Sequence, residues 1–210
     1  MSERVGSESV MFHDGNRRLQ DAFDSRRIAD RLEEKLTHAS FSDSDQAFIE
    51  GAAFFFLATA DDRGRADCSF KGGDAGFVRV IAPGELAFPD YDGNGMFKSL
   101  GNILVNPEVG LLFIDMGAKP RRLRVNGTAS IARDDPLMQR FAGAQLLVRV
   151  KVRAIFPNCP RYIVTPGSSE PSKYAPRPGY EPPEPAWKGF EDFRDYIHPR
   201  QKTPEGDSSG

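Results

Sequence analysis

Short β-forming segments follow one another closely between residues 52 and 165, and this spacing limits the possible folds more than any other feature. Turn signals separate the segments: DDRG at 61–64, APG at 82–84 and MGAKP at 116–120. Connections this short favour a single barrel or sandwich over parallel βαβ units. The predicted strands are FFFLAT, FVRVI, ELAF, VGLLFID, RLRVNGTASI and the alternating segment QLLVRVKVRAIF.

Helical patterns flank and interrupt these strands. Apolar residues recur at helical spacing over Arg17–Leu36, and Ser42 followed by Asp45 predicts a second helix over Asp43–Gly51. Inside the β-rich region, Gly95–Val105 and Asp135–Ala142 are predicted helices, the second with Pro136 at its first position. The predicted fold class is therefore mainly β with flanking helices.

The chain divides into three regions by composition. Residues 1–50 form an N-terminal helical extension, residues 51–165 form the β domain, and residues 166–210 form a proline-rich tail. The tail contains enough aromatic side chains to indicate that part of it docks on a surface, either of its own subunit or of a partner. These are Tyr174, Tyr180, Trp187, Phe190, Phe193 and Tyr196.

Charge and cysteine content exclude several function classes. The 210 residues include 28 basic and 30 acidic side chains, a net charge of −2, which provides no electrostatic footprint for nucleic acid or an anionic membrane. No signal peptide or membrane span is visible, and Cys68 and Cys159 are better read as free thiols than as a disulfide, so a cytoplasmic location is expected. The histidines lack metal-ligand spacing, and no metal site is predicted.

The segment Asp67–Arg79 (DCSFKGGDAGFVR) offers phosphate-binding chemistry between two predicted strands. Glycines allow close backbone approach, and the lysine and serine suit an anion. The alternative is a glycine-rich hairpin with a solvated lysine. The candidate residues are Ser69, Lys71, Gly72, Gly73 and Arg79.

Two further segments provide anion-binding groups. In FPDYDGNGMFKSLGNILVNP a helix opens near Gly95 with Lys98 and Ser99 in its first turn, where free amides make an anion site. An ordinary strand–turn–helix with Asn94 as the cap is equally consistent. In RRLR at 121–124, Arg122 and Arg124 share one strand face, as surface charge or as part of an anion site.

Taken in order, these segments resemble the pyridoxamine 5′-phosphate oxidase-like FMN-binding split barrels. The resemblance covers roughly residues 12–160. More narrowly, it is to the bacterial subgroup of flavin-nucleotide-binding proteins. The segment HDGNRRLQDAFDSRRIADRLEEKL resembles the N-terminal helical extension of that subgroup. It implies a split β-barrel homodimer with FMN at the subunit interface and a small-molecule substrate.

The resemblance also assigns roles to residues. Lys98 and Ser99 match a basic pair that holds the flavin phosphate, and Lys71 or Arg79 replaces the missing second cation. Arg122 matches a glutamine that contacts the flavin ring, where a cation would stabilise the anionic reduced form. No catalytic residue is identified.

Three functional hypotheses follow. The first is an FMN-dependent oxidoreductase, and the second is a flavin-binding protein without turnover. The third is a reductase that uses the deazaflavin F420 in the same groove. FAD is a further alternative cofactor.

Overall fold

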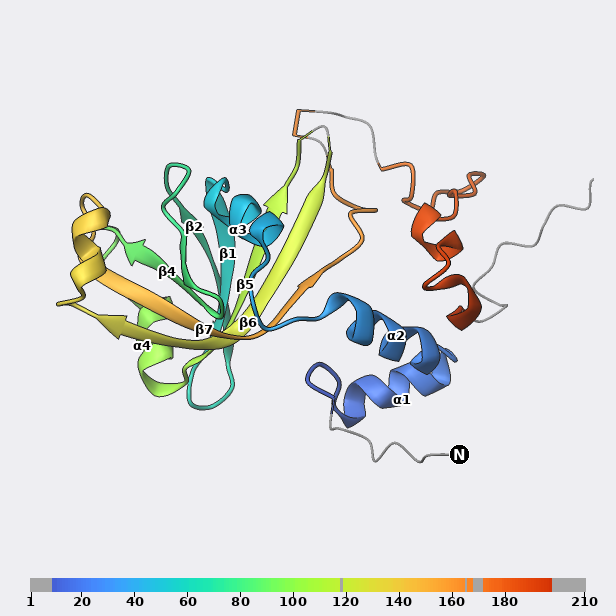
Figure 1. Cartoon of the computed structure of the whole chain (residues 1–210), viewed down its shortest axis with the longest axis horizontal. Helices are drawn as coiled ribbons and strands as arrows, with labels where there is room; N and C mark the ends of the chain where they lie inside the picture. Colours follow the sequence, from blue (N-terminus) through green and yellow to red (C-terminus); the bar gives the residue numbers. More distant parts are fainter. Residues whose placement is uncertain (1–8, 118, 165, 168–171, 198–210) are drawn as a thin grey trace, which may run out of the picture. The chain divides into compact units, whose positions relative to one another are not determined.

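The computed structural model describes residues 9–117, 119–164, 166–167 and 172–197 (Figure 1). Two compact units divide the chain. The barrel unit is His38–Pro160, and the terminal unit combines the residues up to Thr37 with those from Arg161 onward. The predicted N-terminal extension and the predicted tail thus belong to one unit, while the helix over 43–50 belongs to the barrel unit.

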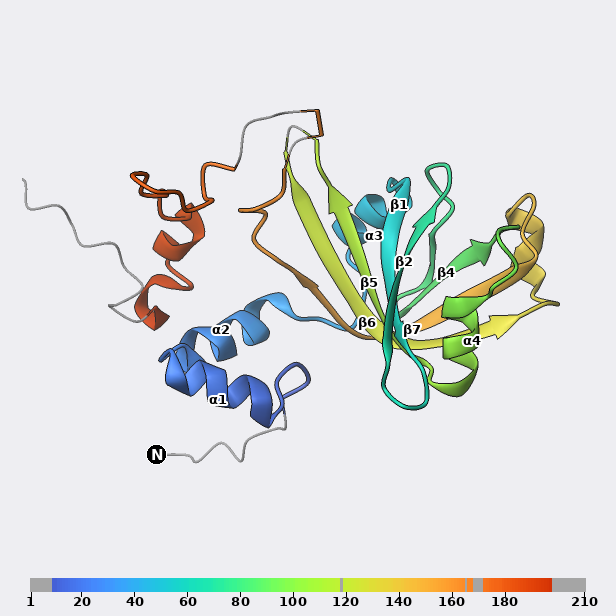
Figure 2. The same ribbon diagram turned by 180° about the vertical axis from the view of Figure 1, so that it is seen from behind.

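A seven-stranded antiparallel sheet forms the described part of the barrel unit, in the order β2-β1-β5-β6-β7-β4-β3 (Figure 1). This confirms a mainly β fold with flanking helices. Edge strand β2 and its partner β1 form a hairpin (Figure 2). The strands are β1 Phe54–Ala60, β2 Ala66–Gly72, β3 Arg79–Ala82, β4 Glu85–Asp90, β5 Glu108–Asp115, β6 Arg121–Ala132 and β7 Leu146–Pro157.

Ring contacts of Phe55 show that the sheet curls on itself. Phe55 on β1 lies 5.0 Å from Phe88 on β4 between ring centroids, although three strands separate β1 and β4 in the sheet. Phe113 on β5 and Phe77 before β3 lie 5.1 and 5.9 Å from the same ring. Because Phe55, Phe88 and Phe113 are almost fully buried, this aromatic cluster is the centre of the core.

The helices differ from the sequence prediction at their ends. The periodic stretch 17–36 lies in two helices, α1 Asp14–Ala22 and α2 Arg26–Leu36, because Asp24 takes a left-handed conformation at φ +49°. Helix α4 spans Lys98–Val105 and so begins three residues after the predicted Gly95. The predicted helix Asp135–Ala142 is a short 3₁₀ turn, η1 Pro136–Arg140, with proline first as expected.

The C-terminal segment docks on α2 within the terminal unit. Phe193 and Ile197 pack with Ile28 in a small apolar cluster that also contains Trp187. Trp187 lies in the 3₁₀ turn η2 Ala186–Gly189, and Phe193 and Ile197 flank the 3₁₀ turn η3 Arg194–Tyr196. Arg31 on α2 forms an ion pair with Asp192 at 3.0 Å. Part of the aromatic tail therefore docks on helix α2 of its own chain.

A buried carboxylate near the start of the barrel unit fixes the first turn of α3 (Asp43–Glu50). Ser42 and Asp45 form the predicted capping box, and Asp45 Oδ2 lies 2.8 Å from His38 Nε2. The His38 main chain exchanges two hydrogen bonds with Ile155 of β7. Burial raises the pKa of Asp45, but hydrogen bonds from Ser42 and His38 outweigh it, so the pKa is lowered overall.

We expect Asp45→Asn to destabilise the protein at neutral pH by about 1–3 kcal/mol, because the charge-assisted hydrogen bonds are lost. The folded pKa lies below the unfolded value of about 3.9, so this stabilisation is present above the unfolded pKa and is lost as pH falls through the folded pKa. Thermal unfolding should show a gap between the two proteins at neutral pH that closes in acid. Asp43→Asn, an exposed neighbour, is the control, and a pH-independent gap would contradict the assignment.

Candidate functional site

The first half of the first predicted site segment is a strand. Asp67–Arg79 was predicted to lie between two strands, but residues up to Gly72 form β2 and pair fully with β1. Alternation puts Asp67, Ser69 and Lys71 on one face of β2, opposite the inward-facing residues of β1, and we call these three the β2 row. The glycines that follow hid this alternation in the sequence.

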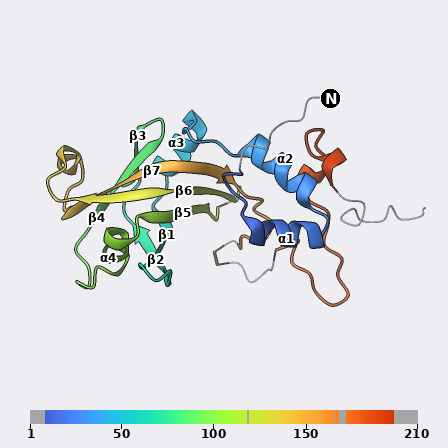
Figure 3. The ribbon, with the colours of Figure 1, turned by 90° about the horizontal axis from the view of Figure 1, so that it is seen from below.

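Helix α4 packs against this hairpin and contributes a buried serine (Figure 3). The Ser99 side chain, 4% exposed, lies 2.9 Å from Ser69 Oγ and 3.3 Å from Asp67 Oδ2. The structure thus brings two predicted residues, Ser69 and Ser99, into direct contact. It adds Asp67, which the sequence analysis did not select.

A second set of polar contacts anchors the next turn of α4. Lys98 Nζ donates to Asn102 Oδ1 at 3.2 Å, and Asn102 Nδ2 donates to Thr59 Oγ1 on β1 at 3.0 Å. Asn102 and Thr59 are both 4% exposed, so the hydrogen bond between them satisfies polar groups that are almost fully buried. The i, i+4 spacing of Lys98 and Asn102 could have revealed this pair from the sequence.

The N-terminus of α4 follows a turn of unusual backbone conformation. Phe97, the residue before the helix, has φ +47°, and Gly95 has φ +73°. Asn94 accepts a hydrogen bond from Met96 N, so it caps this turn and does not cap the helix as the alternative reading supposed. Among the described residues no side chain caps α4, which leaves its first amides available to another acceptor.

The other predicted residues of the first segment lie at different places. Gly72 ends β2, and Gly73 donates its amide to Ala53 O. A Cβ at Gly73 would come within 2.7 Å of the Phe77 ring, so any larger residue there would force Phe77 to shift. Arg79 lies on β3 with its guanidinium 5.8 Å from the Phe141 ring, and no contact joins it to the β2 row among the described residues.

Arg122 and Arg124 lie on the opposite face of the sheet. Their neighbours Leu123 and Val125 point into the core, whereas Arg124 pairs with Leu112, which pairs with Phe56. We call this side the outer face. Its apolar members are Phe54, Phe56, Phe70, Leu112 and Ile114.

The two arginines have no carboxylate partner in the part of the chain that the structure describes. Arg122 donates one hydrogen bond to Cys159 O, and its Nε is buried without a partner. Arg124 lies over the Phe156 ring at 5.9 Å. Burial, and then the charge of Arg122, lower the pKa of Arg124, so an anion placed here would relieve both effects.

The predicted residues therefore fall into three groups. The β2 row and the start of α4 form one group, Arg122 and Arg124 form another on the outer face, and Arg79 stands apart. Their union in one cofactor site stays a prediction.

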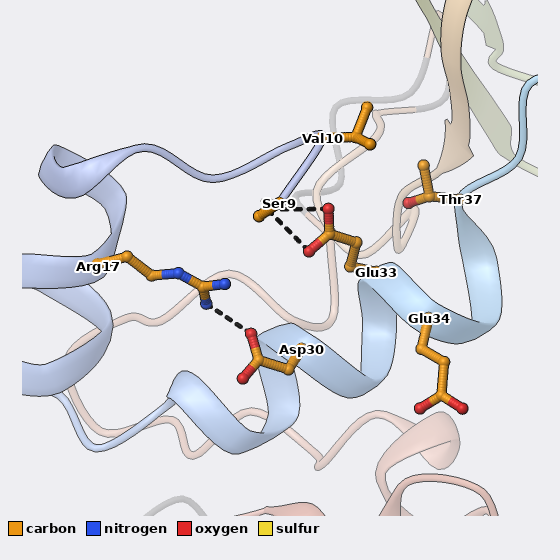
Figure 4. A pocket seen from close by; sticks show the side chains of 7 residues that line it. All are labelled: Ser9, Val10, Arg17, Asp30, Glu33, Glu34 and Thr37. Atoms are coloured by element: carbon orange, nitrogen blue, oxygen red, sulfur yellow. Dashed lines mark hydrogen bonds and ion pairs between the residues drawn. The ribbon is translucent and has the colours of Figure 1, made fainter. Parts of the chain in front are cut away.

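A surface hollow of about 530 Å³ lies in the terminal unit and is lined by none of the predicted residues. Figure 4 shows its polar contacts, Ser9 with Glu33 and Arg17 with Asp30. Its charged groups are already paired with one another in part, which suits a structural role.

Metal and membrane sites are not found among the described residues. No cluster of three potential metal ligands occurs there, and both cysteines are free. No described helix is both long and apolar enough to span a bilayer.

Comparison with known proteins identifies a family. The family model described as pyridoxamine 5′-phosphate oxidase matches residues 41–162, which is more than half of the chain and nearly all of the barrel unit. No curated protein matches.

Three of the solved structures that are similar to this chain are the following. HupZ of Group A Streptococcus is 18% identical, with 56% of this chain covering 93% of that one at a TM-score of 0.45. An FMN-binding protein of Syntrophomonas wolfei is 10% identical; the match covers 70% of this chain and 96% of that one, with a TM-score of 0.44. HutZ, a heme storage protein of Vibrio cholerae, is 17% identical; the match covers 57% of this chain and 92% of that one, with a TM-score of 0.39.

We expect Asn102→Ala to destabilise the protein by about 1–3 kcal/mol, because it leaves Thr59 Oγ1 and Lys98 without their partner. Thr59→Val removes the hydroxyl that accepts the Asn102 hydrogen bond and keeps a similar side-chain volume. A double-mutant cycle by chemical denaturation should give a coupling energy of about 1 kcal/mol. Strict additivity would show that the pair does not hold α4 on the hairpin.

Proposed function

Because the chain belongs to the pyridoxamine 5′-phosphate oxidase family, we propose that it is an FMN-binding oxidoreductase that acts on a small-molecule substrate as a homodimer. The observation that carries the proposal is the contact between Ser99 and Ser69, which sets the uncapped end of α4 beside the β2 row. FMN, when bound, supplies a ring that exchanges hydride, and the protein supplies orientation and charge.

The donor set at this place fits a phosphate ester. Lys71 has no ion-pair partner in the described residues, and Lys98 is held by a neutral amide. Free amides at the start of α4 add a third source of positive potential. Together they provide the charge-assisted hydrogen bonds that a phosphate requires.

The outer face supports the dimer. Phe70, 62% exposed, stacks on Phe54 at 5.3 Å between ring centroids and meets Phe56 edge-on. An aromatic cluster next to Arg122 and Arg124, with Phe70 exposed and Phe54 and Phe56 half-buried, has the composition of a protein–protein interface. A second copy on this face would bury the aromatics and bring its own groups towards the two arginines.

We expect the purified protein to be yellow and to release FMN on denaturation. Lys71→Ala and Lys98→Ala should each weaken FMN binding by roughly tenfold to a hundredfold, because each removes a charged hydrogen-bond donor to the phosphate. Fluorescence titration measures this, with the exposed Lys151→Ala on β7 as the control. Wild-type affinity in both variants would place the phosphate elsewhere.

Identification of the released ligand separates the remaining hypotheses. F420 or FAD in place of FMN would correct the cofactor. A tightly held FMN that no electron donor reduces and no substrate reoxidises would favour a binding protein without turnover.

We expect Phe70→Asp to shift the protein from dimer to monomer at micromolar concentration, because a carboxylate in an apolar interface is left unpaired. Sedimentation velocity measures the mass. Leu19→Asp on α1 removes an equally exposed apolar side chain and is the control, expected to stay dimeric. A monomeric wild-type protein with flavin bound would refute the dimer.

A further inference from the structure

We infer that Asp67 makes the Ser69–Ser99 pair a subsite for the hydroxyl groups of the ligand, and that the phosphate lies at the Lys71 end of the β2 row. This inference rests on the proposed flavin-binding function and adds a specificity-determining residue to it.

The hydrogen-bonding state of the pair supports this assignment. Ser99 Oγ lies within hydrogen-bond distance of both Ser69 Oγ and Asp67 Oδ2, so the carboxylate already serves as an acceptor for the pair. Asp67 is only partly buried, and its Oδ1 receives no hydrogen bond from the described residues. An ionised carboxylate only accepts hydrogen bonds, so it repels a phosphate and attracts a ligand hydroxyl.

Charge changes sign along the β2 row. Alternate residues of a strand stand about 6–7 Å apart, so Asp67 and Lys71 lie at opposite ends of the row with Ser69 between them. The row thus offers a carboxylate, a hydroxyl and an ammonium group in sequence. An elongated ligand with a phosphate next to several hydroxyls matches this order in one direction only.

The direction of α4 gives the same polarity. Asn102 bonds to Thr59, which faces Asp67, and Asn106 near the end of the helix bonds to the Asp61 carbonyl beyond it. The helix therefore runs away from Lys71, and its positive N-terminus points to the lysine end of the row. Lys71 and the helix dipole favour the anion there, whereas Asp67 disfavours it at the serine pair.

The test compares FMN with riboflavin, which differ only in the phosphate. Affinities of the full-length protein for each are measured by fluorescence quenching in wild type, Asp67→Asn, Lys71→Ala and the control Asp62→Asn, an exposed carboxylate in the β1–β2 turn. Asp67→Asn should weaken both ligands by the same factor, about five- to tenfold, because a neutral acceptor replaces a charged one. Lys71→Ala should weaken FMN alone.

Each other outcome is decisive. If Asp67→Asn tightens FMN and leaves riboflavin unchanged, the phosphate lies at the serine pair and the inference is wrong. Unchanged affinity for both ligands also overturns it, while the proposed function stands. Wild-type protein that binds neither flavin overturns the proposed function and the inference together. If Asp67→Asn does not fold, Asp67→Ser gives the same comparison with another neutral acceptor.

Discussion

The contact between Phe55 and Phe88 is the constraint on which the barrel unit depends. Two strands that are distant in the sheet order can touch only if the sheet curls, and burying both rings gives the free energy that holds the curl. Phe113 and Phe77 complete the cluster from other elements. The inner side of the β1–β2 hairpin is thereby fixed relative to the rest of the core.

Polar contacts then extend this order to the candidate site. Leu100 and Ile103 place one face of α4 in the core, and the adjacent Ser99 and Asn102 hydrogen-bond to the hairpin. A buried hydrogen bond is lost if its partner shifts by an ångström, so these contacts set the register of the helix more sharply than apolar packing does. The start of α4 and the β2 row consequently form one preorganised surface.

Much of the fold could be predicted because local pattern and turn chemistry agree. The six predicted strands, the Ser42 cap and the first-turn positions of Lys98 and Ser99 were all visible as periodicity or capping signals. Strand β2 was missed because its alternation of Asp67, Ser69 and Lys71 is short and runs into glycines. Asp67, Thr59 and Asn102 were missed because only the packing of a helix on a hairpin brings them together.

The irregularity where β6 and β7 pair limits how this sheet can vary. Their register shifts between Asn126 and Gly127, and a Cβ at Gly127 would stand 2.0 Å from the Lys151 carbonyl oxygen. No side chain can relieve a clash with main chain at that separation. Any evolved or designed version of this barrel that keeps the register shift must therefore keep glycine at position 127. In a related sequence, another residue at this position would indicate that the two longest strands pair in a different register.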